Sequence, residues 1–261
     1  MPSRDEVDSD TFGMRRSWEA RAETNPLYAI DAGRRDWTFE DFYARGPLLV
    51  ESVVDPALTA LGVDPSGRRV LELGCGMGRL FGALAERFGD VWGIDISTTM
   101  IEQGRQHCPV KATWVVGDGA SLKGIGDDTI DHVVSHEVFV HVPDAQIICS
   151  YMSEIRRVLK PGGTFQAQLR GASDTTRQAM VRSLPRPLRV ASGRVLQWIG
   201  VLPVKGDVDT WLGCIIHPAD ALAMGRHAGF VEEVLRGPDF GEVPRQAPVV
   251  YWLLGRKPLA G

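Results

Sequence analysis

Three glycines at alternate positions, Gly74, Gly76 and Gly78, follow directly on an apolar run that begins at Val70. Glycine is costly inside a strand or a helix because it loses more backbone freedom on folding than any other residue. The stretch VLELGCGMGRL therefore predicts a strand that ends in a glycine-rich turn and leads into a helix. Such a turn lets backbone amides approach a ligand closely, and the helix N-terminus adds a positive dipole end.

Strand and helix patterns alternate along the chain on both sides of this turn. We predict strands at 68–74, 90–96, 111–118, 130–137, 163–170, 230–236 and 247–255, and helices at 79–89, 98–107, 144–160 and 217–230. Ser97 is the predicted N-cap of the second of these helices. The alternation is typical of an α/β fold, a parallel sheet with helices on both faces. The last two strands lack a long crossover between them and predict an antiparallel pair at the sheet edge.

The organisation outside this core is less regular. We expect residues 1–61 to form a helical N-terminal lid with a disordered tip up to about residue 12, and residues 62–261 to form the core of one structural domain. An insert at 171–212 follows the fifth strand and mixes basic with apolar residues. Three interpretations stay open for this insert: a solvated cover, a pocket wall for an anionic or sugar-like substrate, or a docking surface for a membrane or a partner chain.

Charge and cysteine content narrow the function classes. A net charge of −4 and a pI of about 5.9 argue against nucleic acid as the main partner, since phosphate binding usually shows as a basic excess. The four cysteines form no CxxC pair, which favours neither a zinc site nor a disulfide framework. The N-terminus has no secretory pattern and no apolar run reaches about 18 residues, so we expect a cytoplasmic protein without a transmembrane segment. The oligomeric state stays open, a homodimer included.

Two aspartates follow strands on the same expected edge of the sheet as the glycine turn. Asp95 comes 21 residues after Gly74, where a carboxylate can accept hydrogen bonds from ribose hydroxyls. Asp118 ends the third strand, where it can accept from an adenine amino group. The alternative for both is turn formation or helix capping. The dinucleotide pattern G-x-G-x-x-G would need glycine at position 79, and the chain has Arg79 there.

With these residues in place, the chain resembles the class I S-adenosylmethionine-dependent methyltransferases. The resemblance rests on ELGCGMG, VWGIDIS, GDGASL, IDHVVSHEVFVHV and LKPGGTF, which occur in the family's order over roughly residues 65–170. It implies a three-layer Rossmann-like fold with a mostly parallel seven-stranded sheet, an antiparallel C-terminal strand pair, a helical N-terminal lid and an insert after strand five. It also implies S-adenosyl-L-methionine as cofactor.

The resemblance also implies roles for single residues. Gly74 and Gly76 would face the methionine part of the cofactor, and Asp95 would hold the ribose. Glu72 would orient the turn. The remaining residues expected at the cofactor are Cys75, Ile96, Met100, Asp118, Gly119, Ala120 and His136. The N-terminal segment adds several aromatic side chains whose faces attract a sulfonium cation, with Tyr28 as the expected lid contact and ordinary helix packing as the alternative.

Histidines in the loop after the fourth strand are the candidates for acceptor activation. A hydroxyl acceptor needs a base, and histidine suits neutral pH, so we expect His141 and His136 to be catalytic, with packing roles as the alternative. Some quinone-type O-methyltransferases have a similar segment with two glutamates and a histidine that bind magnesium. Here Glu137 and His141 match, but Val140 replaces one carboxylate. Because hard cations prefer several oxygen ligands, the sequence disfavours a metal, with magnesium on Glu137 and His141 as the alternative.

The sequence as a whole favours transfer of a methyl group to a hydroxyl of a small molecule, of sugar, natural-product or phenol and quinone type. Small-molecule N-methylation is the first alternative. A NAD-type oxidoreductase and a non-catalytic cofactor-binding protein are the alternatives from other classes. The acidic pI and the lack of an Asn/Asp-Pro-Pro-Tyr amine motif weigh against an RNA or protein methyltransferase.

Overall fold

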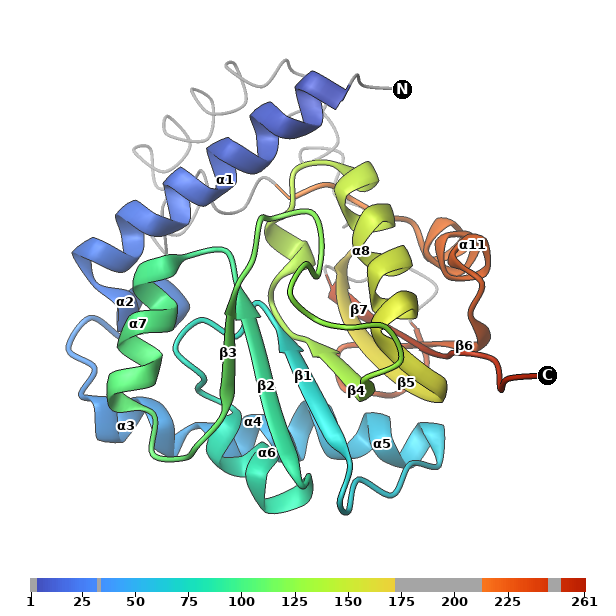
Figure 1. The fold of residues 1–261 in the computed structure, drawn as a ribbon, viewed down its shortest axis with the longest axis horizontal. Helices are drawn as coiled ribbons and strands as arrows, with labels where there is room; N and C mark the ends of the chain where they lie inside the picture. Colours follow the sequence, from blue (N-terminus) through green and yellow to red (C-terminus); the bar gives the residue numbers. More distant parts are fainter. Residues whose placement is uncertain (1–3, 32–33, 172–212, 244–249) are drawn as a thin grey trace.

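The computed structural model describes residues 4–31, 34–171, 213–243 and 250–261 (Figure 1). Its centre is a seven-stranded sheet in the order β3-β2-β1-β4-β5-β7-β6. The strands are β1 (Arg69–Leu73), β2 (Asp90–Asp95), β3 (Thr113–Val116), β4 (Ile130–Ser135), β5 (Leu159–Arg170), β6 (Val231–Arg236) and β7 (Val250–Arg256). The predicted insert, apart from its first residue, lies outside the described residues.

Strand direction follows the sequence prediction. The first five strands are parallel to one another, and β7 pairs antiparallel with both β5 and β6. The antiparallel C-terminal pair is therefore confirmed, with β7 inserted between β5 and the edge strand β6. The order changes direction between β1 and β4, and ligands of open α/β sheets bind at such a point, beyond the carboxyl ends of the strands.

Helices cover both faces of the sheet. The helical elements are α1 (Arg4–Thr24), α2 (Pro26–Ile30), α3 (Phe39–Ala44), α4 (Gly46–Leu49), the π-helix η1 (Val50–Val54), α5 (Asp55–Leu61), α6 (Phe81–Arg87), α7 (Thr98–His107), the 3-10 helix η2 (Phe139–His141), α8 (Ala145–Val158) and α11 (Pro218–Ala228). Val70 and Val134 pack with η1, α5 and α6, whereas Leu71 and Val133 pack with α8 and α11. Successive strand residues point to opposite faces, so this alternation fills both cores and gives three layers.

The helix ends show how the local sequence determines where a helix begins and ends. The Ser97 hydroxyl accepts a hydrogen bond from Met100 N, which confirms the predicted N-cap of α7. Helix α8 ends at Val158, earlier than predicted, because β5 already begins at Leu159 and runs through Pro161. No helix in the described part of the chain is long and apolar enough to cross a membrane.

Of the N-terminal segment expected to form a lid, α1 and α2 lie at the carboxyl edge of the sheet, whereas η1 and α5 pack against a face of the sheet as part of the core (Figure 1). Glu19 of α1 accepts hydrogen bonds from the backbone and the hydroxyl of Thr99, at 3.0 and 2.7 Å, and so ties α1 to the first turn of α7. The expectation of a disordered tip differs from the structure, in which α1 already begins at Arg4.

Candidate functional site

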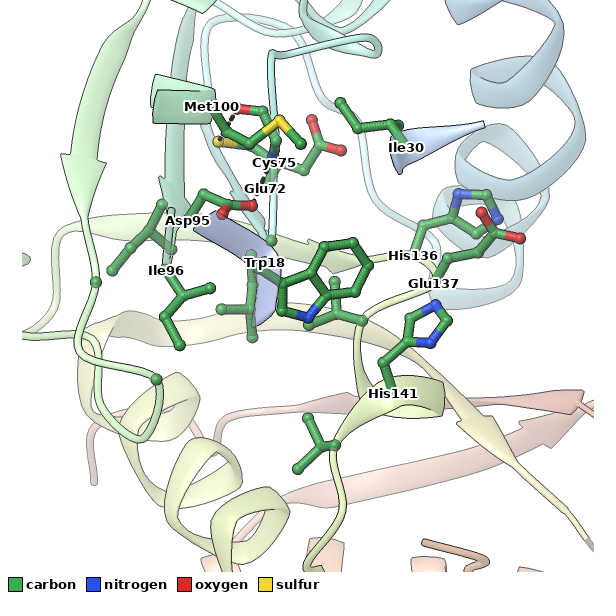
Figure 2. A pocket seen from close by; sticks show the side chains of 18 of the residues that line it. Trp18, Ile30, Glu72, Cys75, Asp95, Ile96, Met100, His136, Glu137 and His141 are labelled. Atoms are coloured by element: carbon green, nitrogen blue, oxygen red, sulfur yellow. Dashed lines mark hydrogen bonds between the residues drawn. The ribbon is translucent and has the colours of Figure 1, made fainter. Parts of the chain in front are cut away.

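A cavity opens at the carboxyl edge of the sheet, beneath α1 and α2 (Figure 2). It collects residues from the glycine turn, from the ends of β2, β3 and β4, and from the N-terminal helices. The lining residues are Met14, Trp18, Ala29, Ile30, Glu72, Leu73, Gly74, Cys75, Gly76, Arg79, Leu80, Ile94, Asp95, Ile96, Met100, Gly117, Gly119, His136, Glu137, Val138, His141, Val142 and Tyr151. Most of the residues that the sequence placed at a cofactor are therefore brought together.

The glycine turn has the backbone that only glycine adopts without strain. Gly74, Gly76 and Gly78 have φ values of 74°, 52° and 75°. A Cβ at Gly74 would overlap the side chain of Val138, and one at Gly76 would lie 2.8 Å from Ile30 Cδ1. The first and second glycines are thus needed both for the turn and for the close approach of Val138 and Ile30.

Asp95 connects this turn to helix α7. Its Oδ2 accepts a hydrogen bond from Gly76 N at 2.8 Å, and its Oδ1 accepts one from Ser97 N at 2.9 Å. Burial raises the pKa of Asp95, although the two backbone donors act in the opposite direction. Each carboxylate oxygen keeps a second lone pair, so the group can still accept from a ligand hydroxyl in the cavity.

Glu72 is a buried carboxyl at the floor of the cavity. It is 6% exposed, and its Oε2 has no hydrogen-bond partner among the described residues. Burial raises the pKa of Glu72 to about 8, with a further contribution from Asp95, while the cation of Arg79 opposes the rise. A buried polar atom without a partner is costly, and a ligand group that donates a hydrogen bond or carries positive charge would remove that cost.

Arg79 is the cation of this cavity, and its role there was not predicted. Its Nη1 donates to Asp31 Oδ2 at 3.0 Å, and its guanidinium lies over the ring of Phe42. The side chain is 9% exposed, and burial lowers its pKa. The motif pattern placed a charge next to the third glycine, but the sequence carries no signal that this side chain, in the turn before α6, lies close enough to Glu72 to interact with it.

The apolar end of the cavity is formed by Ile96, Met100 and the loop after β3. Gly119 has a φ of 95°, and a Cβ there would lie 2.7 Å from Ile96 Cδ1. Asp118 and Ala120, which the sequence placed here, do not line the cavity. Asp118 instead accepts hydrogen bonds from Ser121 Oγ at 2.6 Å and from the nitrogens of Ser121 and Ala120, so the turn role is the one observed.

The opposite end carries the two predicted histidines and Glu137. His136 lies parallel to the ring of Trp252 at 5.7 Å between centroids, and burial, assisted by Arg79, lowers its pKa to about 4. Glu137 has a φ of 57°, rare for a residue with a side chain, and its nitrogen donates to Gln168 Oε1 at 3.0 Å. Both side chains border the same space as His141 (Figure 2).

The aromatic contact from the N-terminal lid is made by Trp18 rather than by Tyr28. Trp18 projects from α1 into the cavity and lies edge-on to His141 (Figure 2). Tyr28 lies under the guanidinium of Arg35 and does not line the cavity, although its neighbours Ala29 and Ile30 do. Successive helical residues point about 100° apart, so only part of α2 can face inward. Within the described residues, no three His, Cys, Asp or Glu side chains form a metal-binding group.

Residues 70–163 match the family described as a methyltransferase domain. A ubiquinone biosynthesis O-methyltransferase from Methylococcus capsulatus is 31% identical over 132 residues, 49% of this chain and 52% of that protein. A 2-methyl-6-phytyl-1,4-hydroquinone methyltransferase from Synechocystis is 36% identical over 107 residues, 39% of this chain and 32% of that protein. The chain thus spans about half the length of the O-methyltransferase that it matches.

Solved structures show the same fold at low identity. Haemonchus contortus phosphoethanolamine N-methyltransferase 2, in complex with S-adenosyl-L-methionine, has a TM-score of 0.56 and 17% identity over 86% of this chain and 58% of that chain. An S-adenosylmethionine-dependent methyltransferase from Mesorhizobium loti has a TM-score of 0.52 and 19% identity over 77% of this chain and 96% of that chain. The expected Rossmann-like methyltransferase fold is confirmed.

Proposed function

We propose that this chain, whose residues 70–163 form a class I S-adenosylmethionine-dependent methyltransferase domain, transfers the methyl group to a hydroxyl oxygen of a small molecule. The observation that carries the proposal is the cavity itself. It joins a strained glycine turn, a carboxylate that retains free lone pairs at Asp95 and an unpartnered buried carboxyl at Glu72. Those groups match the ribose of S-adenosylmethionine, its amino acid end and the chain that joins the two.

The residues present fit the cofactor along the length of the cavity. Asp95 would accept from the ribose hydroxyls, and the apolar end of the cavity, lined by Ile96, Met100 and Gly119, would hold the adenine. The carboxyl of Glu72 and the guanidinium of Arg79 both line the cavity at the glycine turn, which suits the ammonium and the carboxylate of the methionine end. The free oxygen of Glu72 is the strongest support for this orientation.

Methyl transfer from this cofactor places two requirements on the protein, alignment of the acceptor and exclusion of water. The cofactor supplies a sulfonium methyl that is already activated for in-line displacement by the acceptor oxygen. The protein must align the acceptor and keep water out, and the indole of Trp18 over His141 serves both needs. We assign His141 as the base that takes the hydroxyl proton. The low pKa of His136 keeps that imidazole neutral at pH 7, so it adds no positive charge beside a sulfonium.

The names of the relatives and the residues at the acceptor end of the cavity both bear on the class of acceptor. One relative is named for O-methylation in ubiquinone biosynthesis and another for a 1,4-hydroquinone, a ring with two hydroxyls. Trp18 and Ile30 give the acceptor end an apolar wall, and His141 gives it a proton acceptor. This combination supports a hydroxylated ring over a small aliphatic amine.

The test begins with binding and continues with transfer. Calorimetry should show binding of S-adenosylhomocysteine and none of NAD; the reverse would make the chain an oxidoreductase. A cell extract is then incubated with methyl-labelled cofactor and either the wild-type protein or Asp95→Ala. A labelled ring ether that forms only with the wild type supports the proposal. Labelled N-methyl products would show that the acceptor is an amine and not a hydroxyl. Binding without any labelled product would indicate a non-catalytic protein.

A further inference from the structure

The loop between β3 and β4, residues 117–129, forms part of the cavity wall without any helix or strand of its own. Gly117 and Gly119 line the cavity at its apolar end. A segment without a hydrogen-bond ladder keeps a fixed position only if other parts of the molecule hold it. The position of the cavity wall at this end therefore depends on the contacts that hold the loop.

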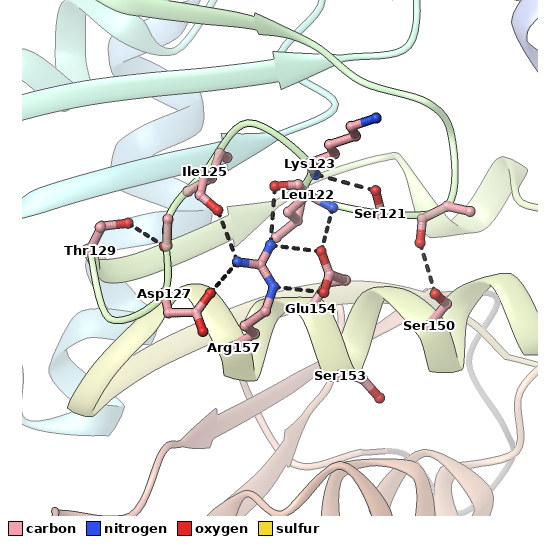
Figure 3. A network of polar contacts seen from close by, with 12 residues as sticks. Ser121, Leu122, Lys123, Ile125, Asp127, Thr129, Ser150, Ser153, Glu154 and Arg157 are labelled. Carbon is pink, nitrogen blue, oxygen red and sulfur yellow. Dashed lines mark hydrogen bonds and ion pairs between the residues drawn. The ribbon is translucent and has the colours of Figure 1, made fainter.

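The main anchor comes from one face of helix α8, where Arg157 and Glu154 form a two-point ion pair (Figure 3). Arg157 Nε donates to Glu154 Oε1 at 2.7 Å, and Nη2 donates to Oε2 at 2.8 Å. The same guanidinium donates to the carbonyl oxygens of Ile125 at 2.9 Å and Leu122 at 3.2 Å, and to Asp127 Oδ1 at 2.6 Å. Glu154 Oε2 in turn accepts from Leu122 N at 2.9 Å.

Other contacts hold the loop at its two ends. Leu122 and Ile125 are buried in the core beneath α8. Ser150 Oγ, one turn before Glu154 on the same helix, donates to the carbonyl oxygen of Ala120 at 2.9 Å. The nitrogen of Asp128 donates to the carbonyl oxygen of Arg157 at 3.1 Å. Helix α8 therefore serves as a rigid support for the loop from residue 120 to residue 129.

We infer that Arg157 and Glu154 are positioning residues for the adenine end of the cofactor, although neither touches the cavity. This inference rests on the proposed function. Partly exposed ion pairs usually add little to stability, and these side chains are 30% and 22% exposed. Here the guanidinium holds two backbone carbonyls and two carboxylates at once, which is a geometry that a lysine cannot reproduce. The pair therefore determines the place of the loop more than the stability of the fold.

The loop packs closely against its neighbours at the apolar end of the cavity. A Cβ at Gly119 would lie 2.7 Å from Ile96 Cδ1 and 3.5 Å from Thr11 Cβ, so the loop already contacts the residue after β2 and helix α1. Arg15 of α1 also donates to the carbonyl oxygen of Gly117 at 3.4 Å. Because Gly117 and Gly119 line this end of the cavity, small shifts of the loop would change its shape and the fit of an aromatic base against it.

The chain offers a matched control for this inference. Arg87 forms an ion pair of the same two-point kind with Asp55, with N–O distances of 2.6 and 2.7 Å, and also donates to a backbone carbonyl. That pair joins α6 to α5 and has no contact with residues 117–129. Arg157→Lys and Arg87→Lys therefore remove comparable interactions, one at the loop and one elsewhere.

The experiment measures the Kd of S-adenosylhomocysteine and of 5′-methylthioadenosine, which lacks the amino acid end, well below the Tm of each variant. We expect Arg157→Lys to raise both Kd values between about threefold and thirtyfold, in the range seen for residues that act on a ligand indirectly. Glu154→Gln should act in the same direction, whereas Arg87→Lys should lower the Tm without changing either Kd. Hydrogen exchange should increase within residues 117–129 in Arg157→Lys.

The outcomes separate the two proposals. If the wild-type protein binds S-adenosylhomocysteine and Arg157→Lys binds it equally well, the positioning role is wrong and the proposed function stands. If the wild-type protein does not bind S-adenosylhomocysteine, both the positioning role and the proposed function are wrong. A Kd that rises equally in Arg157→Lys and Arg87→Lys would show a general effect of stability and would also overturn the inference.

Discussion

The indole of Trp18 meets the imidazole of His141 edge-on, with 5.4 Å between ring centroids and 72° between the ring planes. Trp18 belongs to helix α1 and His141 to the short helix η2 after β4, so the contact joins the N-terminal lid to the loop that follows the sheet. Edge-to-face pairs are a favoured aromatic geometry. The indole therefore packs against the histidine that borders the cavity.

His141→Ala should separate catalysis from binding. We expect the labelled-methyl transfer rate to fall by about 10²- to 10⁴-fold, as for loss of a general base, while the Kd of S-adenosylhomocysteine stays nearly unchanged. Trp18→Phe, which keeps an aromatic ring over the imidazole, should lose much less rate. Equal losses of rate and affinity in His141→Ala would instead indicate a structural role for this side chain.

Gly74→Ala should destabilise the protein through the backbone of the turn. Left-handed φ at an alanine and overlap with Val138 together should reduce the free energy of unfolding by at least about 2 kcal/mol. Urea denaturation measures this change. Gly82→Ala, on helix α6 with open space around it, should be neutral or stabilising. A second variant that adds Val138→Ala should recover only the part of the loss that is due to overlap.

Local chemistry explains which features could be predicted from sequence. The glycine turn, Asp95 and the N-cap Ser97 are predictable because each depends on a few adjacent residues. The lid contact was assigned to Tyr28 and belongs to Trp18, because the direction of a side chain on a helix depends on how the whole helix packs. The placement of Arg79 in the cavity likewise depends on Asp31, 48 residues earlier in the chain.

His132 should make stability depend on pH in the acidic range. It is fully buried in β4, its Nδ1 lies 2.8 Å from Thr164 Oγ1, and burial lowers its pKa to about 4. The unfolded chain binds a proton near pH 6.5 and the folded one only near pH 4, so stability is fully present above pH 6.5 and falls as the pH drops toward 4. The loss attributable to this residue should reach about 3 kcal/mol.

The comparison for this pH effect is between two histidine variants. His132→Gln removes the titration, so its free energy of unfolding should change less between pH 6.5 and pH 4 than that of the wild type. His217→Gln alters an exposed histidine at the start of α11 and should retain the wild-type slope. Identical slopes in all three proteins would show that His132 does not contribute. His136, whose pKa is also lowered to about 4, adds to the residual slope.

Glu72 should release a proton when the cofactor binds. Its pKa of about 8 in the free protein leaves most of the carboxyl protonated at pH 7. An ammonium group next to Oε2 favours the ionised form, so binding lowers the pKa and expels the proton. Calorimetry of S-adenosylhomocysteine binding at pH 7 in phosphate and in Tris, which differ in ionisation enthalpy, measures the protons released. For the same reason the affinity should rise with pH between 6 and 7.5.

Two variants decide whether Glu72 is the source of that proton. Glu72→Gln keeps the shape of the side chain but cannot ionise, so it should bind more weakly and lose the difference between the buffers. Glu102→Gln changes an exposed carboxyl on α7 and should behave as the wild type does. If the buffer dependence survives in Glu72→Gln, the proton comes from another group, and the ammonium of the ligand does not lie against this carboxyl.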